Sequence, residues 1–260
     1  MAATRMRSIL FQTSAVARRM LTEFIRQRRG LIFWAAFPAL MMLLFGFMYS
    51  NPALHISLDA TPAGILIGAA LFFSCLGGTV SLIAGERERR TLRRLLVSPL
   101  DPIAYFLGIV AALSVIAFFQ AAIVYGLGYL IGARYHGSVW LGATIVALSV
   151  FAYVGLGFFF GARFAKRAED VSGPVAAFGV PLLVLAGTFF PIRLLPNLLL
   201  KIAYFDPIFH MNEAMKAVSG RGDGWADVAG DLIFLGVFAA AALGLGIYSY
   251  RRMLIEEKRS

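Results

Sequence analysis

Six long apolar segments without Asp, Glu, Lys, Arg or His constrain the fold of this chain more than any other feature. A helix needs about 20 apolar residues to cross about 30 Å of hydrocarbon, because lipid offers its backbone no hydrogen-bond partner. Each of the six segments is close to this length. The sequence therefore predicts an all-α integral membrane protein with six transmembrane helices. We expect these spans at residues 31–50, 62–84, 103–131, 140–162, 171–190 and 232–250.

The composition supports this class. Hydrophobic residues make up 60% of the 260 residues and charged residues only 15%, whereas soluble domains have about 45–50% and about 25%. A water-soluble globule of this size could not bury so much apolar surface. The single cysteine, Cys75, lies inside an apolar run, so an internal disulfide is excluded.

The distribution of basic residues predicts the orientation. Of the 24 Lys and Arg residues, 19 lie before the first span, between the second and third, between the fourth and fifth, or after the sixth. Cytoplasmic loops carry such an excess. We therefore expect a multi-pass protein of the cell membrane (plasma or inner membrane) with both termini in the cytoplasm. Topology thus explains the net charge of +10 without nucleic-acid binding.

Residues 1–30 are too charged to cross a membrane. Apolar pairs recur in them at nearly helical spacing, with arginines on the other side. This pattern is typical of an amphipathic helix in the membrane interface, although a simple anchor for the first span has the same pattern. The main membrane domain is then expected at 31–250, with a cytoplasmic tail at 251–260.

The region before the last span is rich in proline and contains two apolar stretches that are too short to cross. Irregular backbone at membrane depth is stable only where protein or a water-filled cavity shelters it. We interpret residues 191–218 as a re-entrant helical hairpin that enters from the outer face. The alternative is a plain extracytoplasmic loop.

Glycines spaced four residues apart permit helices to approach closely. Such pairs occur at positions 64 and 68, 128 and 132, and 157 and 161. With 26 glycines in the chain, this spacing also arises by chance. The pairs favour internal packing more than a dimer interface.

Several kinds of chemistry are missing from the sequence. There is no G-x-x-x-x-G-K-[ST] phosphate loop, no zinc-ligand spacing and no G-x-S-x-G or H-E-x-x-H motif. Ion-coupled carriers place acidic or histidine side chains within the membrane, and the expected spans have none. We therefore expect no cofactor on this chain and an energy source on a partner.

The stretch GERERRTLRRLLVSPLDP, residues 85–102, carries seven charges between Glu86 and Arg94. Glu86 precedes Arg90 by four residues, which supports a helix, and two prolines end it before the third span. Such a helix over residues 86–98 has two interpretations. It is an orientation anchor that needs only positive charge, or a docking element for a partner.

This stretch resembles the E-x-E-x-G-T-L-x-x-L-x-x-[ST]-P-[LV] motif of ABC-2-type transporter permeases, with Arg90 in place of the usual glycine. The matching residues are Glu86, Glu88, Thr91, Leu92, Leu95, Ser98 and Pro99. The segment before the last span is similar to a second motif of the family, most of all in its drug-export and nodulation-factor-export branches. Its residues here are Phe190, Pro191, Leu195, Pro196, Asp206, Pro207, His210, Glu213 and Lys216.

The resemblance implies a permease subunit of an ATP-driven exporter of amphiphiles such as drugs, lipids or lipo-oligosaccharides. A separate ATPase subunit would bind ATP and Mg²⁺, and a second copy or a sister permease would complete the path. In the family the first motif forms a cytoplasmic coupling helix. The residues implied for ATPase docking are Glu86, Arg87, Glu88, Arg89, Arg90, Thr91 and Leu92. The candidates for an outer gate are Phe189, Phe190, Pro191, Pro196, Pro207, His210 and Glu213.

Other functions share this topology. A membrane scaffold subunit needs no transport path, and an ion-coupled secondary carrier needs no ATPase. A membrane-embedded enzyme is the weakest alternative, because no nucleophile and base or metal set can be assembled. For the gate phenylalanines, packing or lipid contact is an equally simple interpretation.

Overall fold

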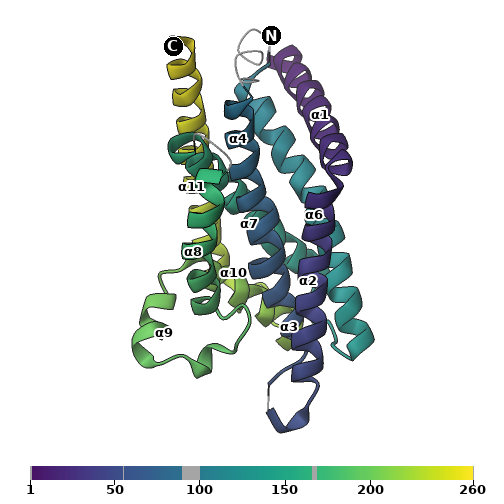
Figure 1. The fold of residues 1–260 in the computed structure, drawn as a ribbon. Helices are drawn as coiled ribbons and strands as arrows, with labels where there is room; N and C mark the ends of the chain where they lie inside the picture. The colour runs from purple at the N-terminus through teal and green to yellow at the C-terminus, as the bar shows by residue number, and fades with distance from the viewer. Residues whose placement is uncertain (1, 55, 90–99, 166–168, 260) are drawn as a thin grey trace.

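The computed structural model describes residues 2–54, 56–89, 100–165 and 169–259, which form helices and loops without a strand. The long helices make a bundle with both chain ends at the same end of it (Figure 1). The long helices are α1 (Ala2–Arg26), α2 (Arg28–Tyr49), α6 (Pro102–Ile131), α7 (Val139–Phe164), α8 (Glu169–Leu185) and α11 (Ala229–Arg259). The shorter ones are η1 (Pro52–Leu54), α3 (Thr61–Gly64), η2 (Ile65–Gly77), α4 (Gly78–Glu88), η3 (Ile192–Leu194), α9 (Asn197–Ala203), α10 (Pro207–Lys216) and η4 (Ala217–Arg221).

Five helices in the described residues are long and apolar enough to cross a membrane. They are Arg28–Tyr49, Thr61–Glu88, Pro102–Ile131, Val139–Phe164 and Ala229–Glu256. They coincide with the first four predicted spans and the last one. The predicted all-helical membrane class is therefore confirmed.

The fifth predicted span, 171–190, is not among these five helices. Its counterpart α8 has 17 residues, which corresponds to roughly 25 Å. The helix ends because Gly187 adopts a left-handed conformation, with φ 66°. The Gly187 amide donates to Val184 O and the Thr188 amide to Leu183 O, which is the Schellman arrangement of a helix end. The complete six-span layout therefore stays a prediction.

The second span is the centre of the bundle. It runs without interruption through α3, η2 and α4, and its middle part η2 is a π-helix of 13 residues. Eleven of these residues are buried, because α2, α6, α7, α8 and α10 all pack on it. Segments of π-helix are rare and occur often at functional positions.

Two of the predicted glycine contacts are confirmed where α7 crosses α4. A Cβ atom on Gly157 would lie 2.6 Å from Thr79 Cβ, and one on Gly161 would lie 2.9 Å from Ile83 Cβ. Only glycine permits this separation of the two backbones. Gly132 has a different role, because it ends α6 with φ 114°.

The predicted N-terminal helix is present as α1, which ends where Gln27 leaves the helical conformation. Its apolar side chains Val16, Met20 and Phe24 are buried, and its main neighbour is the start of α6. The opposite side exposes large hydrophobic side chains, among them Phe11. The helix packs on the bundle along one face, and its position in a membrane interface stays a prediction.

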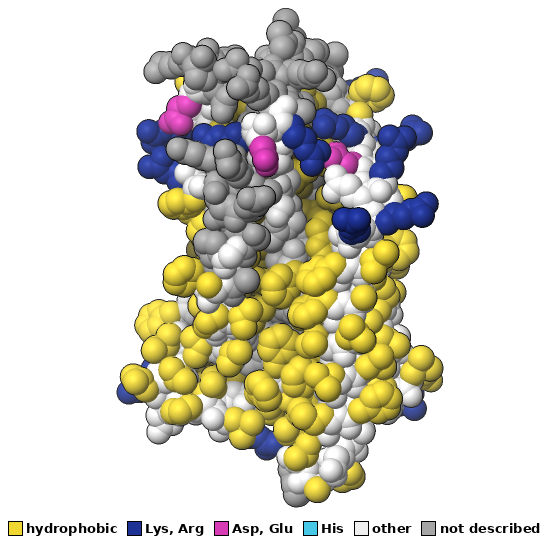
Figure 2. Space-filling view, in the orientation of Figure 1, with side chains coloured by type: hydrophobic (Ala, Val, Ile, Leu, Met, Phe, Trp, Pro, Cys, Tyr) yellow, Lys and Arg dark blue, Asp and Glu magenta, His cyan; other side chains and the backbone are white. Residues whose placement is uncertain are grey.

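Figure 2 shows a broad belt of hydrophobic side chains over the middle and lower part of one face, while Lys and Arg gather at the end that holds the termini. A chain in water would not present such a belt, because exposed apolar patches of this extent are rare on soluble proteins.

The outer region 191–218 contains the two short helices expected from its apolar stretches. They are α9 and α10, and both lie at the end of the bundle opposite the termini (Figure 1). Most of α10 is buried, whereas α9 exposes most of its apolar side chains. Whether this pair re-enters the membrane stays a prediction.

The contact between α7 and α4 leads to a test. Replacing Gly157 by Leu should separate the two helices and destabilise the protein by about 1–3 kcal/mol, because the new side chain has no space. Thermal unfolding in detergent measures the effect. Gly126→Leu is the matched control, since an added Cβ there meets nothing within 4 Å. Equal stability of both variants would contradict the packing described here.

Candidate functional site

Glu86 lies in the last turn of α4 and faces the protein interior, with only 6% of it exposed. Tyr105 Oη in α6 donates to Glu86 Oε2 at 2.5 Å. Arg19 Nη2 in α1 lies 3.9 Å from Glu86 Oε1. Tyr105 also stacks on Tyr250 of α11, with ring centroids 5.4 Å apart. Glu86 therefore joins α4 to α1 and α6.

The next three residues extend toward the end of α4. Arg87 Nη1 donates to Ala165 O at 3.0 Å, where α7 ends. Glu88 and Arg89 are exposed, and Arg89 Nη1 lies 3.7 Å from Glu23 Oε1 of α1. Charged side chains thus link the end of the second span to its neighbours.

This placement changes the interpretation of the predicted docking residues. Little of Glu86 is exposed to a partner in this chain, so its role as a docking charge stays a prediction. Glu88 and Arg89 keep the exposure that docking needs. The other predicted docking residues Arg90, Thr91 and Leu92, with most of the predicted helix 86–98, lie outside the described residues.

A cavity of about 510 Å³ lies beside these residues, between α1, α2, the second span and α8. Its lining combines charged and aromatic side chains, so a molecule with polar and apolar parts would find partners for both. The charged residues are Arg19, Glu23, Glu86, Glu88 and Arg89, and the aromatic ones are Phe24, Phe33, Trp34 and Phe73.

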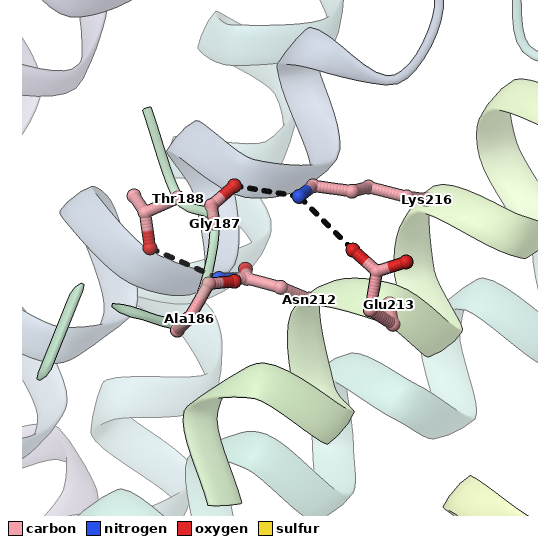
Figure 3. Close-up of polar contacts among 6 residues, drawn as sticks. All are labelled: Ala186, Gly187, Thr188, Asn212, Glu213 and Lys216. Atoms are coloured by element: carbon pink, nitrogen blue, oxygen red, sulfur yellow. Dashed lines mark hydrogen bonds and ion pairs between the residues drawn. The ribbon is translucent and has the colours of Figure 1, made fainter. Parts of the chain in front are cut away.

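At the opposite end of the bundle, the turn at residues 186–190 is held by side chains of α10. The amide of Asn212 lies 3.0 Å from Ala186 O and 2.9 Å from Thr188 Oγ1, with Nδ2 as the donor in both contacts (Figure 3). Asn212 is fully buried. The Asn212 side chain therefore donates hydrogen bonds to two polar groups of the turn that ends α8.

Two more side chains bind the same turn. Lys216 Nζ donates to Gly187 O at 2.6 Å and lies 3.2 Å from Glu213 Oε1 (Figure 3). Tyr49 Oη, at the end of α2, donates to Phe189 O at 2.5 Å. The turn is thus fixed from α10 on one side and from α2 on the other.

Thr188 fits into a notch on the second span. A Cβ atom on Gly68 would collide with the Thr188 side chain, and one on Gly64 would collide with the Thr188 carbonyl. The glycine pair therefore permits the turn after α8 to contact the buried span directly.

Aromatic rings cover the turn. Phe45 of α2 stacks on Phe189 with centroids 5.5 Å apart and meets Phe190 edge-on at 5.8 Å. Beside them lies a second cavity, of about 330 Å³. Its lining includes four of the predicted gate residues, Phe189, Phe190, Pro191 and Glu213, together with Phe45, Tyr49, Arg193, Lys216 and Arg221.

The remaining gate candidates, Pro196, Pro207 and His210, are not part of this lining. Pro196 precedes α9, and Pro207 is the first residue of α10. His210 Nε2 donates to Tyr204 O at 3.0 Å, and its Nδ1 lies 2.8 Å from Asp231 Oδ1 of α11. His210 therefore joins α10 to the start of the last span.

Burial shifts the pKa of two groups, one in α10 and one at its N-cap. It lowers the pKa of Lys216, and the carboxylate of Glu213 opposes this effect. It raises the pKa of Asp206, which is 5% exposed, to about 6. The Ile208 amide, which donates to Asp206 Oδ1 at 2.9 Å, and the nearby His210 limit the shift of Asp206.

Sequence reasoning did not identify Tyr49, Thr188 or Asn212 as site residues. For Tyr49 and Thr188 the available signal was a polar group within an apolar stretch, because a buried polar group needs a partner. Asn212 lies among charged residues, and the sequence gives no such signal for it. Among the described residues, no group of three or more His, Cys, Asp and Glu could hold a metal ion.

Comparison with known proteins agrees with this architecture. Residues 58–248 match the family model described as "ABC-2 family transporter protein". The chain is 25% identical over 178 residues to "Inner membrane transport permease YhhJ" of Escherichia coli (strain K12), and equally to the protein of that name from Shigella flexneri. The match covers 68% of this chain and 47% of each relative. The chain thus spans about half the length of these relatives.

The raised pKa of Asp206 predicts a pH dependence of stability. The folded state binds this proton more tightly than the unfolded chain, whose Asp pKa is about 3.9. Protonation of Asp206 therefore contributes fully to the free energy of unfolding below about pH 4. This contribution, about 3 kcal/mol at most, is lost as pH rises to about 6. Asp206→Asn keeps the helix cap and should remove this slope from unfolding curves recorded between pH 4 and 7.

Asp101→Asn is the matched control. Asp101 caps α6 in the same Asp-Pro-Ile sequence, with Ile103 N 2.8 Å from its Oδ1, but it is only half-buried. Asp206→Asn should change the pH slope more than Asp101→Asn. The reverse order would show that burial of Asp206 is not the cause.

Proposed function

Because the chain belongs to the ABC-2 family of transporter proteins, we propose that it is the permease subunit of an ATP-binding-cassette exporter. It moves an amphiphilic substrate out across the membrane, with energy from ATP and Mg²⁺ on a separate ATPase subunit. The observation that carries this proposal is the family match over residues 58–248. Membership of the family implies a transmembrane transporter subunit that is itself non-catalytic.

The chain itself supports a division of labour. It lacks a phosphate loop, so it has no device of the usual kind to bind and hydrolyse ATP. The five long apolar helices found in the described residues supply the membrane part. The work that drives transport then has to enter through protein contacts.

We propose that the end with both termini faces the cytoplasm. Lys and Arg gather there (Figure 2), as the positive-inside rule requires. The relatives from Escherichia coli and Shigella flexneri are named as inner membrane permeases, which supports the same kind of membrane.

Glu88 and Arg89 are the described residues proposed to contact the ATPase. Both are exposed at the proposed cytoplasmic end. Arg89 also pairs with Glu23, so a force on α4 would reach α1. Glu86 then has a positioning role, because its contacts to Tyr105 and Arg19 tie the end of α4 to the bundle.

The two cavities suggest where the substrate enters and leaves. The 510 Å³ cavity at the inner end has both charged and aromatic lining, which suits an amphiphile. The outer cavity lies beside the rings of Phe45, Phe189 and Phe190. We propose that this aromatic cluster and the turn 186–190 form the outer gate, and that a second copy or a sister permease completes the path.

The docking proposal predicts that Arg89→Glu weakens copurification of the ATPase about tenfold or more and lowers ATP turnover of the complex. The reason is that an acidic ATPase surface that pairs with Arg89 would then face a like charge. Pull-down from detergent extracts and phosphate release measure the two effects. The control is Arg134→Glu, an exposed arginine at the other end of the bundle, stacked on Tyr129 at 4.6 Å. An unchanged complex with Arg89→Glu would remove Arg89 from the docking surface.

The orientation predicts the access of a membrane-impermeant maleimide to single introduced cysteines. The native Cys75 is buried, so its background labelling should be low. Gly224→Cys, at the proposed outer end, should react in intact cells. Arg252→Cys should react only after the membrane is permeabilised. The opposite pattern would invert the topology and contradict export by a cytoplasmic ATPase.

A further inference from the structure

The first span carries a backbone defect near its middle. Pro38 lies inside α2 and is buried. A proline has no amide hydrogen, so it leaves the carbonyl four residues earlier without its usual helical donor. That carbonyl belongs to Trp34. In a membrane, a carbonyl in this position needs a donor from the protein, because the hydrocarbon has none.

Gln120 of α6 supplies a donor at this point. Its Nε2 lies 2.9 Å from Trp34 O, and the residue is only 2% exposed. A carbonyl oxygen only accepts hydrogen bonds, so the amide group of Gln120 must turn its nitrogen to Trp34. The side chain of one span therefore replaces the amide that Pro38 lacks in another.

A third span fixes the orientation of Gln120. The Ser74 hydroxyl in η2 lies 3.0 Å from Gln120 Oε1 and 2.9 Å from Ala70 O of its own helix. Ser74 is fully buried. The hydrogen bonds between Ser74, Gln120 and Trp34 O thus connect the π-helical segment, α6 and α2.

Pro38 divides α2 into halves with different contacts. The inner half holds α1, because Trp34 meets Phe24 edge-on with centroids 5.3 Å apart, and Trp34 lines the inner cavity. The outer half holds the turn 186–190 through Phe45 and Tyr49, which line the outer cavity. A change of angle at Pro38 would move one set of contacts relative to the other.

We infer that Pro38 is a hinge of the first span and that Gln120 is its positioning residue. Sharp bends of helices occur at prolines and at places where a side chain enters the backbone ladder, and both conditions meet here. The hydrogen bond from Gln120 keeps Trp34 O satisfied while the two halves of α2 change their angle. Its role in transport rests on the proposed function, whereas the hydrogen-bond relation between Gln120 and Pro38 does not.

A double-mutant cycle tests this relation in the full chain. Gln120→Leu should lower the Tm in detergent by about 5 °C, because it leaves Trp34 O without this donor. In a Pro38→Ala background the restored amide can bond to Trp34 O, so the same substitution should cost less than half as much. Equal losses in the two backgrounds would overturn the inference.

Two control variants separate this effect from the loss of any buried polar group. Ser149→Ala removes a buried hydroxyl in α7 that donates to Ile145 O of its own helix at 2.8 Å; its cost should be the same in the native and the Pro38→Ala backgrounds. Ser74→Ala should cost less than Gln120→Leu, because it leaves the bond to Trp34 in place. A cost of Ser149→Ala that differs between the two backgrounds would show that the cycle reports a general weakening of the bundle.

The hinge is tested by ATP turnover of the permease and its copurified ATPase in lipid vesicles. Pro38→Ala should keep or raise the Tm but lower kcat severalfold, with KM for ATP unchanged because ATP binds to the partner. A structural role alone would lower the amount of complex and not its kcat. An unchanged kcat would overturn the hinge. If no ATPase copurifies, the proposed function fails, and the cycle still decides the role of Gln120.

Discussion

The rest of the structure depends on one constraint, which is that a backbone carbonyl in an apolar bundle needs a hydrogen-bond donor. At three places where a helix is interrupted or has ended, a side chain from another element donates a hydrogen bond to the exposed carbonyl. Gln120 does so for Trp34 O, and Arg87 does so for Ala165 O where α7 ends. In the turn after α8, three carbonyls accept hydrogen bonds from the side chains of Asn212, Lys216 and Tyr49. These bonds join α2 to α6, α4 to the end of α7, and the turn after α8 to α2 and α10.

Polar contacts between helices form an inner and an outer assembly. The inner one is built around Glu86 and joins α1, α4 and α6. The outer one is built around the turn 186–190 and joins α2, α8 and α10 to the glycine notch of the second span. The second span belongs to both assemblies, and α2 connects the outer assembly to α1 through the contact between Trp34 and Phe24. A transporter that receives work at one end and opens at the other needs such continuous elements.

Much of the fold followed from the sequence, because the length of an apolar run and its lack of charge are direct consequences of the bilayer. Five of the six predicted spans coincide with long apolar helices, and the N-terminal helix and the two short outer helices are present as predicted. The length of the fifth span was not, because a hydropathy pattern does not report that Gly187 ends α8. The burial of Glu86 was missed because a run of charges does not show which one faces Tyr105. Gln120 was missed because only ionisable side chains were sought within the spans.

The π-helical segment η2 has a consequence for the geometry of the whole second span. Each of its turns holds more residues than a turn of α-helix, because its hydrogen bonds reach five residues instead of four. If one π turn became an α turn, the segment would lengthen and everything beyond it would rotate about the axis. Glu86 at one end would then be displaced relative to Gly64 and Gly68 at the other. The central span can therefore couple a change of its length to a rotation about its own axis.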